Sequence, residues 1–388
     1  MSNIIISSNN LKKTLSLPRS KSWAARFLIL ASLSEKEVTI HQLPKAQDTK
    51  DLLLALKCVG LEVEHLSNSK RIKNSFPKCE RESHDTVKIP VGEGGTTIRF
   101  LIPLLSLGKN KYELIFSPSM LKRPMADLYK ALEQLGVSVE INSQGVILQG
   151  PIKTNDNSLE VDAKSSSQFA SAFLMLSTAV ELKLSISNLI NSKRYFELTK
   201  KAIDLIQSQN EVLVPVDYSG VGYLVAYSFI NHDYVLESVG DPDEFQTDIQ
   251  LIEILNSIGG DIKFTGNNLY IPQCRKILGG FDVDGSQFLD LIPTLSFVAS
   301  FIDYTSIIRN IDGLKDKESD RLEELLKILK YFNVSYFYEH GTLKISGKRD
   351  FQSQEVNYST TWDHRMAMCV TMFTKMHGGG KLEPHACV

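Results

Sequence analysis

A helix-then-strand pattern recurs along the chain and constrains its fold more than any other feature. Each copy has an amphipathic helical stretch, a Gly or Asn, and a short strand-like stretch. Copies occur at LLLALKCVGLEVE, LYKALEQLGVSVE, LIEILNSIGGDIKF and LLKILKYFNVSYF, with a weaker one at AIDLIQSQNEVLV. Leu and Ile recur in them at three- and four-residue steps, the helical period. We expect the stop residue of each copy to end its helix in the left-handed region; these residues are Gly60, Gly136, Asn210, Gly259 and Asn333.

The spacing of these stop residues indicates two domains. Successive stops from Gly60 to Asn210 lie 76 and 74 residues apart, and Gly259 and Asn333 again lie 74 apart. The step from Asn210 to Gly259 is only 49 residues. Helix–Gly–strand units are common in proteins, but near-equal spacing argues against coincidence. We therefore predict two domains of repeated strand and helix units, joined near residues 210–220; the period is too long for a solenoid.

Composition narrows the class of protein. The 388 residues are 43% hydrophobic, which suffices for at least two cores. A formal net charge of -2 argues against general nucleic-acid binding. The five cysteines are odd in number and form no CxxC pair, which predicts unpaired thiols in a reducing compartment. No apolar run has the length of a secretory signal or a membrane span, so we predict a cytoplasmic protein.

Polar residues occupy the start of an otherwise apolar helical stretch at LPRSKSWAARFLILASL. Ser22 and Arg26 are four residues apart and would share a helix face, with Lys21 beside them. The free N–H groups and the dipole of a helix start favour an anion there. This stretch therefore indicates an oxyanion or phosphate site, although a Ser cap followed by solvated cations would explain the same residues.

Further apolar helices begin in the same way. VGEGGTTIRFLIPLLSLG has glycines and threonines ahead of Arg99, but it lacks the Walker A and dinucleotide-binding patterns. AKSSSQFASAFLML has three hydroxyls where one cap would suffice. GLKDKESDRLEELLKIL places cations at a helix start, against the dipole. TTWDHRMAMCVTMF contains one His without partners, which does not support a metal site.

Asp290 lies among apolar residues in SQFLDLIPTLSFVASF. An unpaired Asp is rare in such surroundings, and its pKa would be tunable, so it is a candidate base. If the polar helix starts of both halves converge on an interdomain cleft, that cleft would attract polyanions.

Taken in their order, these motifs resemble the 5-enolpyruvylshikimate-3-phosphate synthase family of enolpyruvyl transferases. The resemblance covers about Leu17 to Phe373 and rests on SKS with Arg26, GGTTIR, SSQF, KESDR and DHRMAM. It implies an α/β fold of two similar domains, each of three β-α-β-α-β-β units, with the active site in the interdomain cleft. It implies a discontinuous C-terminal-type domain of residues 1–16 plus 216–388, and an N-terminal-type domain of residues 17–215.

The implied reaction transfers the enolpyruvyl group of phosphoenolpyruvate to the 5-hydroxyl of shikimate 3-phosphate, with release of phosphate. It belongs to the shikimate pathway, which leads to chorismate and the aromatic amino acids. The resemblance implies no metal and no organic cofactor, no nucleic-acid or membrane partner, and a monomer. Two anionic substrates need cations to offset their repulsion, and Arg suits carboxylate and phosphate.

The resemblance also assigns roles to residues of this chain. Asp290 would lie beside the attacking hydroxyl, Glu318 would protonate the methylene carbon, and Lys21 would meet phosphoenolpyruvate. The full set of implied substrate contacts is Lys21, Ser22, Arg26, Gly95, Thr96, Arg99, Arg123, Ser166, Ser167, Gln168, Ser192, Tyr195, Asp290, Lys317, Arg321 and Arg365.

Several positions depart from the family pattern. Ser119 stands where the family has an arginine that contacts phosphoenolpyruvate. Ala25, Glu93 and Trp362 stand where it has asparagines. The segment FTKMHGGGKLEPHACV lacks the family's lysine-bearing ending. These departures motivate an alternative: a homologue that binds shikimate 3-phosphate without efficient turnover.

A sister enzyme that acts on UDP-N-acetylglucosamine is a further alternative. That family begins with a Lys-Asn pair and uses a loop cysteine. This chain has Lys21 followed by Ser22, and no cysteine between Cys79 and Cys274. The sequence therefore disfavours this alternative.

Overall fold

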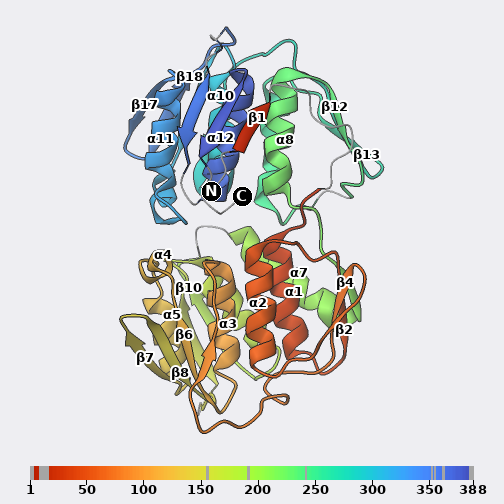
Figure 1. Cartoon of the computed structure of the whole chain (residues 1–388), viewed down its shortest axis with the longest axis vertical. Coiled ribbons are helices and arrows are strands. Elements are labelled where there is room, and N and C mark those ends of the chain that lie inside the picture. The colour runs from red at the N-terminus through yellow and green to blue at the C-terminus, as the bar shows by residue number, and fades with distance from the viewer. Residues whose placement is uncertain are drawn as a thin grey trace. The chain divides into compact units, whose positions relative to one another are not determined.

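The structure is a computed structural model of the chain (Figure 1). It describes residues 4–7, 17–153, 157–189, 193–240, 243–350, 353, 355–360 and 363–383. Contacts divide the chain into two compact units, Arg19–Pro215 and Met1–Pro18 with Val216–Val388. Both combine helices with several small sheets, so the predicted α/β class with two similar domains is confirmed. We keep the assignment of residues 1–16 to the C-terminal-type domain as a proposal.

Three apolar helices form the centre of the unit Arg19–Pro215. They are α1 (Lys21–Leu33), α3 (Gly95–Leu105) and α6 (Ser167–Leu176), and each packs against the other two. Nearly all of their residues are buried, as expected for helices that are apolar on every side. The remaining helices of the unit are α2 (Gln47–Cys58), α4 (Pro118–Leu121), α5 (Ala126–Gln134) and α7 (Lys193–Ser208).

The sheets of this unit repeat one arrangement. In the sheet β5-β6-β8-β7, two parallel strands are followed by an antiparallel hairpin, with α3 and α5 between the strands in sequence, which is a complete β-α-β-α-β-β unit. The sheet β11-β2-β4-β3 has the same order of parallel and antiparallel pairs, and β9 pairs with β10 in parallel. The strands are β2 (Val38–His41), β3 (Val63–His65), β4 (Ser69–Ile72), β5 (Val87–Ile89), β6 (Lys111–Ile115), β7 (Ser138–Asn142), β8 (Gly145–Gln149), β9 (Ser158–Asp162), β10 (Lys183–Ser187) and β11 (Glu211–Leu213).

The second unit has a comparable centre. Its inner helices are α8 (Tyr218–Asn231), α10 (Ile292–Ser300) and α12 (His364–Met376), which pack against one another (Figure 1). The other two α-helices described in this unit are amphipathic: α9 (Gln250–Ser257) and α11 (Arg321–Tyr331). Short 3₁₀ turns precede several of them: η1 (Thr247–Ile249), η2 (Gly285–Gln287), η3 (Leu289–Leu291) and η4 (Asp312–Asp316).

Three sheets accompany these helices. The sheet β15-β16-β18-β17, with α10 and α11, is again a complete β-α-β-α-β-β unit. The others, β12-β14-β13 and β1-β20-β19, have three strands each among the residues described, and β1 pairs antiparallel with β20. The strands are β1 (Ile4–Ser7), β12 (Tyr234–Leu236), β13 (Lys263–Thr265), β14 (Asn268–Ile271), β15 (Asp282–Asp284), β16 (Thr305–Arg309), β17 (Ser335–Glu339), β18 (Thr342–Ser346), β19 (Val356–Ser359) and β20 (Gly379–Glu383).

The predicted helix stops are found at four of the five positions. Gly60, Gly136, Gly259 and Asn333 have φ values of 96°, 72°, 114° and 54°. The expectation was wrong for Asn210, which has no positive φ. There α7 ends at Ser208, and the chain runs directly into β11, where the Asn210 carbonyl accepts from Thr39 N at 2.8 Å. Strand pairing replaces the left-handed cap.

Within the part of the chain described, no helix is both long enough and apolar enough to cross a bilayer. Cys58, Cys79, Cys274 and Cys369 are free thiols. Cys387 lies outside the described residues.

Candidate active site

The start of α1 carries a cation with an acidic neighbour. Ser20 caps the helix and accepts from Trp23 N at 3.5 Å. Lys21 is the first helical residue, and its Nζ lies 3.5 Å from the carboxylate of Asp48 on α2. Both side chains are about one-third exposed, at 31% and 37%, so an anion from solvent could compete for this lysine. Ser22 is also partly exposed.

Arg26 lies deeper, with only 1% of its surface exposed. Its Nε donates to Thr199 Oγ1 at 2.8 Å, and its other two nitrogens donate to the carbonyls of Ser22 and Tyr195 at 2.9 and 3.0 Å. The guanidinium also lies 5.0 Å from the ring centroid of Phe100. Burial lowers the pKa of Arg26 to about 10. These contacts join α1 to α7, and they use three of the five guanidinium N–H groups.

The starts of α3 and α6 are connected by one amide side chain. Gln168 donates to Thr96 Oγ1 at 2.7 Å and accepts from Arg99 at 2.9 Å. Arg99 also donates to the carbonyl of Pro124 at 3.1 Å. Gly95 is buried at the first position of α3, and a Cβ there would lie only 2.4 Å from a terminal nitrogen of Arg123. The glycine therefore allows Arg123 to lie directly over the α3 start.

The three serines before and at the start of α6 make different contacts. Ser166 is the N-cap and accepts from Gln168 N at 3.2 Å, whereas Ser165 donates to Asp127. Ser167 is the first helical residue and is 9% exposed. Only one of the three hydroxyls caps the helix, as the excess of serines suggested. Tyr195 is half-buried on α7.

The structure thus brings most of the predicted residues of this unit to the starts of its inner helices. Ser192 lies outside the described residues. Two departures from the family pattern are visible: Ser119 is a short side chain 3.0 Å from Ser117 Oγ, and Glu93 is exposed. Ser119 supplies no cation where the family pattern has an arginine, and Glu93 adds a negative charge where it has an asparagine.

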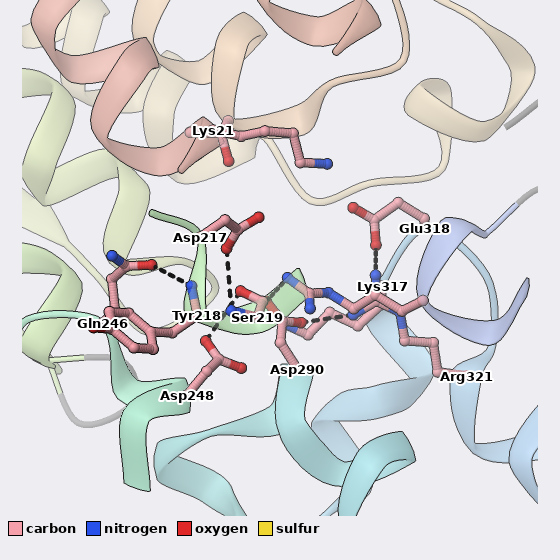
Figure 2. Close-up of polar contacts among 12 residues, drawn as sticks. Lys21, Asp217, Tyr218, Ser219, Gln246, Asp248, Asp290, Lys317, Glu318 and Arg321 are labelled. Carbon is pink, nitrogen blue, oxygen red and sulfur yellow. Dashed lines mark hydrogen bonds and ion pairs between the residues drawn. The ribbon is translucent and has the colours of Figure 1, made fainter. Parts of the chain in front are cut away.

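In the second unit, Arg321 is the centre of a charged cluster (Figure 2). It is the first residue of α11 and is 1% exposed. Its three nitrogens donate to three carboxylates: Asp363 at 2.6 Å, Asp290 at 2.6 Å, and Glu318. Burial opposes its charge, but these acids raise the pKa of Arg321 above its usual range. The positive charge of Arg321 at the start of α11, which the helix dipole disfavours, is therefore compensated by carboxylate side chains.

Asp290, on η3 before α10, faces three cations. Its Oδ1 is 3.4 Å from Lys317 Nζ and accepts from Arg321, and its Oδ2 is 3.2 Å from Arg365. Burial disfavours the charged form, but Arg365, Lys317 and Arg321 outweigh it and hold the pKa of Asp290 well below its usual range. Asp290 is thus a paired acid with a side chain that is 24% exposed, and its three cations favour the ionised form.

The start of α12 is organised by Asp363. Its Oδ1 caps the helix and accepts from Arg365 N at 2.9 Å, and its Oδ2 accepts from Ser319 at 3.2 Å as well as from Arg321. The Arg365 carbonyl accepts from Tyr223 OH of α8 at 3.1 Å. The sequence placed Asp363 beside His364 and Arg365 but gave no sign that it would be this buried counter-ion.

Sequence reasoning missed a second buried acid, Asp248 on η1. Its Oδ2 accepts from Ser219 Oγ at 3.2 Å near the start of α8. The neighbouring Gln246 fixes this turn by accepting from Tyr218 N at 3.0 Å (Figure 2). It also donates to the Val216 carbonyl at 2.7 Å. In the sequence, an acid just before an amphipathic helix is typical of ordinary dipole compensation, so the pattern gives no sign of a buried carboxylate.

The described residues contain no group of three or more His, Cys, Asp or Glu side chains that could hold a metal ion. The unit Arg19–Pro215 instead gathers hydroxyls, a glycine and Arg or Lys side chains at helix starts, and the second unit gathers hydroxyls with Arg and Lys side chains. Such groups bind anions, and the paired carboxylates of the second unit add proton-accepting and proton-donating capacity.

Comparison with known proteins agrees with this chemistry. The sequence model of the family described as EPSP synthase (3-phosphoshikimate 1-carboxyvinyltransferase) matches residues 5–207 and 205–380. Relatives with the name 3-phosphoshikimate 1-carboxyvinyltransferase include one from Caldivirga maquilingensis, 27% identical over 90% of this chain and 86% of the relative. Another, from Edwardsiella ictaluri, is 29% identical over 92% of this chain and 88% of the relative.

Solved structures show the same fold. EPSP synthase from Acinetobacter baumannii superposes with a TM-score of 0.77 at 20% identity, over 98% of this chain and 93% of that one. The enolpyruvyl transferase NikO from Streptomyces tendae gives a TM-score of 0.73 at 11% identity, over 98% and 92%. Since the family's sequence model matches nearly the whole chain, this chain belongs to the EPSP synthase (3-phosphoshikimate 1-carboxyvinyltransferase) family.

Proposed function

We propose that this chain transfers the enolpyruvyl group of phosphoenolpyruvate to the 5-hydroxyl of shikimate 3-phosphate and releases phosphate. The observation that carries the proposal is the cluster in which Asp290 and Glu318 share contacts with Arg321, beside Lys317 and Arg365. The reaction needs one group that accepts a proton from oxygen and another that delivers one to carbon. Two carboxylates in different surroundings suit those two roles.

We assign the proton-accepting role to Asp290. The 5-hydroxyl oxygen adds to C2 of phosphoenolpyruvate, and its proton goes to the carboxylate. In the ligand-free protein, Asp290 is a weak base because three cations hold its pKa low. Anionic substrates that engage Lys317 and Arg365 would share those cations, and the basicity of Asp290 would rise where it is needed.

We assign proton delivery to Glu318, whose side chain is 40% exposed. It would protonate the C3 methylene as the C2–O bond forms, giving a tetrahedral intermediate with a methyl group. Return of one methyl proton to Glu318 and cleavage of the C2–phosphate bond would then regenerate the enol ether and release phosphate. Because Glu318 contacts Arg321, its acidic form requires that this contact weaken when substrates bind.

The unit Arg19–Pro215 would supply most of the binding groups. Lys21 and Arg123 are proposed to meet phosphoenolpyruvate, and Ser166 and Gln168 to hold shikimate 3-phosphate. A cytoplasmic monomer remains the expectation from the sequence.

The proposal is tested by measuring phosphate release with both substrates, together with calorimetric binding of shikimate 3-phosphate and then phosphoenolpyruvate. We expect release that requires both compounds and that falls sharply in the variants Asp290→Asn and Glu318→Gln. Asp261→Asn, which removes an exposed acid paired with Lys263, serves as the control and should keep full activity. Binding of shikimate 3-phosphate with no phosphate release would instead identify a homologue without efficient turnover.

A further inference from the structure

Asp248 is a buried carboxyl group with little to compensate its charge. It is 2% exposed, and it accepts one hydrogen bond, from Ser219 Oγ at 3.2 Å. Its other oxygen, Oδ1, is buried and has no hydrogen-bond partner among the described residues. Buried carboxylates normally have several donors or an ion pair, because an isolated buried charge is costly. The Asp248 carboxylate departs from this rule, because it has one hydrogen bond and its second oxygen has no partner among the described residues.

The charged groups that face Asp248 come from three elements. Arg365 of α12 favours its charged form, whereas Asp290 of η3 and Asp217 at the start of α8 disfavour it. The helix that follows, α9, contributes Glu253 as its one charged residue, and that side chain is exposed. Among the described residues, Arg365 is the cation that acts most strongly on Asp248, and it already forms an ion pair with Asp290 at 3.2 Å.

Together, these groups place the protonation equilibrium of Asp248 close to neutral pH. Burial is the largest effect and, despite Arg365, raises the pKa of Asp248 to about 6. At pH 7 the ligand-free protein would hold it mostly ionised, with roughly a tenth of the molecules protonated. Any added negative charge near Arg365 would raise this pKa further.

We infer that Asp248 takes up a proton from solvent when phosphoenolpyruvate engages Arg365, so that anion binding is coupled to neutralisation of this buried carboxylate. The inference rests on the proposed function, which places the anionic ligand at Arg365. The ligand adds negative charge beside Asp290 and Asp217, and it draws Arg365 away from its role as the cation facing Asp248. Binding also raises the basicity of Asp290, but Asp290 keeps its contacts with Lys317 and Arg321, so Asp248 is the acid that takes the proton before the reaction begins.

This coupling has a defined sign. Because the bound state holds a proton that the free state lacks, affinity for phosphoenolpyruvate falls as pH rises above about 6. Asp248 would act as a positioning residue: in its neutral form it leaves the Arg365 guanidinium to the ligand and to Asp290. An asparagine at this position would imitate that neutral form at every pH.

Calorimetric titration with phosphoenolpyruvate, in the presence of shikimate 3-phosphate, tests the inference. Titration at pH 7 in two buffers of different ionisation enthalpy gives the number of protons taken up on binding. Asp248→Asn is the test variant, and Glu253→Gln, which removes an exposed acid from the adjacent helix, is the control. Comparison between the variants cancels protons gained or lost by the ligand itself.

We expect wild type and Glu253→Gln to take up about half a proton or more per ligand beyond the value for Asp248→Asn. We also expect Asp248→Asn to bind phosphoenolpyruvate with an affinity that depends less on pH. Equal proton uptake in wild type and Asp248→Asn would overturn the inference while leaving the proposed function intact. Absence of phosphoenolpyruvate binding to the wild-type protein would overturn both.

Discussion

Arg321 and Asp363 form an ion pair in which both side chains are almost fully withdrawn from solvent. Nε lies 2.6 Å from Oδ2, and the exposed fractions of the two side chains are 1% and 0%. Desolvation makes such a pair a weak source of net stability, but removing one partner leaves an uncompensated buried charge. The pair fixes the start of α11 to the start of α12, and with it the orientation of the Arg321 groups that meet Asp290 and Glu318.

The first prediction concerns this pair. Asp363→Asn keeps a good helix cap but removes the most deeply buried of the three carboxylates that Arg321 faces. We expect it to lower the free energy of unfolding by about 3 kcal/mol, measured by chemical denaturation. The matched control is Asp282→Asn, which breaks the pair of Asp282 with Arg309, whose side chains are 51% and 49% exposed. That change should cost less than about 1 kcal/mol, and equal losses in both variants would contradict this account.

The second prediction separates catalysis from binding at Asp290. Asp290→Asn removes the proposed proton acceptor and also one anion that faces Lys317, Arg321 and Arg365. We expect kcat to fall by about 10²-fold or more, while affinity for phosphoenolpyruvate stays the same or increases. Steady-state kinetics with calorimetry would measure both, and a weakened affinity with unchanged kcat would be the opposite of what we predict.

The third prediction concerns the close approach at the α3 start. In Gly95→Ala, the new Cβ would lie 2.4 Å from the Arg123 guanidinium, which must then move. We expect a KM for phosphoenolpyruvate raised by about tenfold or more, with little loss of stability, because the side chain displaced is flexible. Gly279→Ala, where nothing lies within 4 Å of the added Cβ, is the control and should behave as wild type. A normal KM in Gly95→Ala would show that Arg123 is not a substrate contact.

The fourth prediction concerns pH and stability at Asp248. The pKa of Asp248 in the folded protein, about 6, lies above the ordinary Asp value of 3.8. The stabilising effect of protonation is therefore complete below 3.8 and is lost as pH rises through about 6. Asp248→Asn does not titrate. Its stability relative to wild type should therefore increase between pH 4 and 7 by on the order of 2 kcal/mol, measured by denaturation at several pH values. A difference that does not change with pH would argue against a raised pKa.

Much of the fold could be predicted because its signals are local. Helical periodicity and a terminal Gly or Asn locate α2, α5, α9 and α11, and four of the five predicted stops have the expected backbone conformation. Asn210 was mispredicted because strand pairing of β11 with β2, a long-range interaction, decides the backbone there. Helix propensity and capping patterns carry no information about such pairing.

The sequence predicted the polar helix starts of the candidate site but not the side-chain contacts that link them to other elements. The polar starts of α1, α3, α6 and α12 are visible in the sequence because polar residues interrupt apolar runs. The sequence could not show that Arg26 would be buried against α7, or that Arg321 would face three carboxylates. The same holds for Asp248, because its environment is set by Ser219 and Arg365, which are distant in sequence and approach it only once the chain has folded.

The pairing of β1 with β20 has a consequence for how the protein is made. Ile4 aligns with Leu382, so the first strand leaves the ribosome almost a full chain length before its partner exists. The contiguous unit Arg19–Pro215 can fold while synthesis continues, whereas the other unit must wait for the last helix and strand to emerge. Until then the nascent β1 strand has no sheet to join. A chain truncated within the last repeat would have one folded unit and one unit with an exposed core.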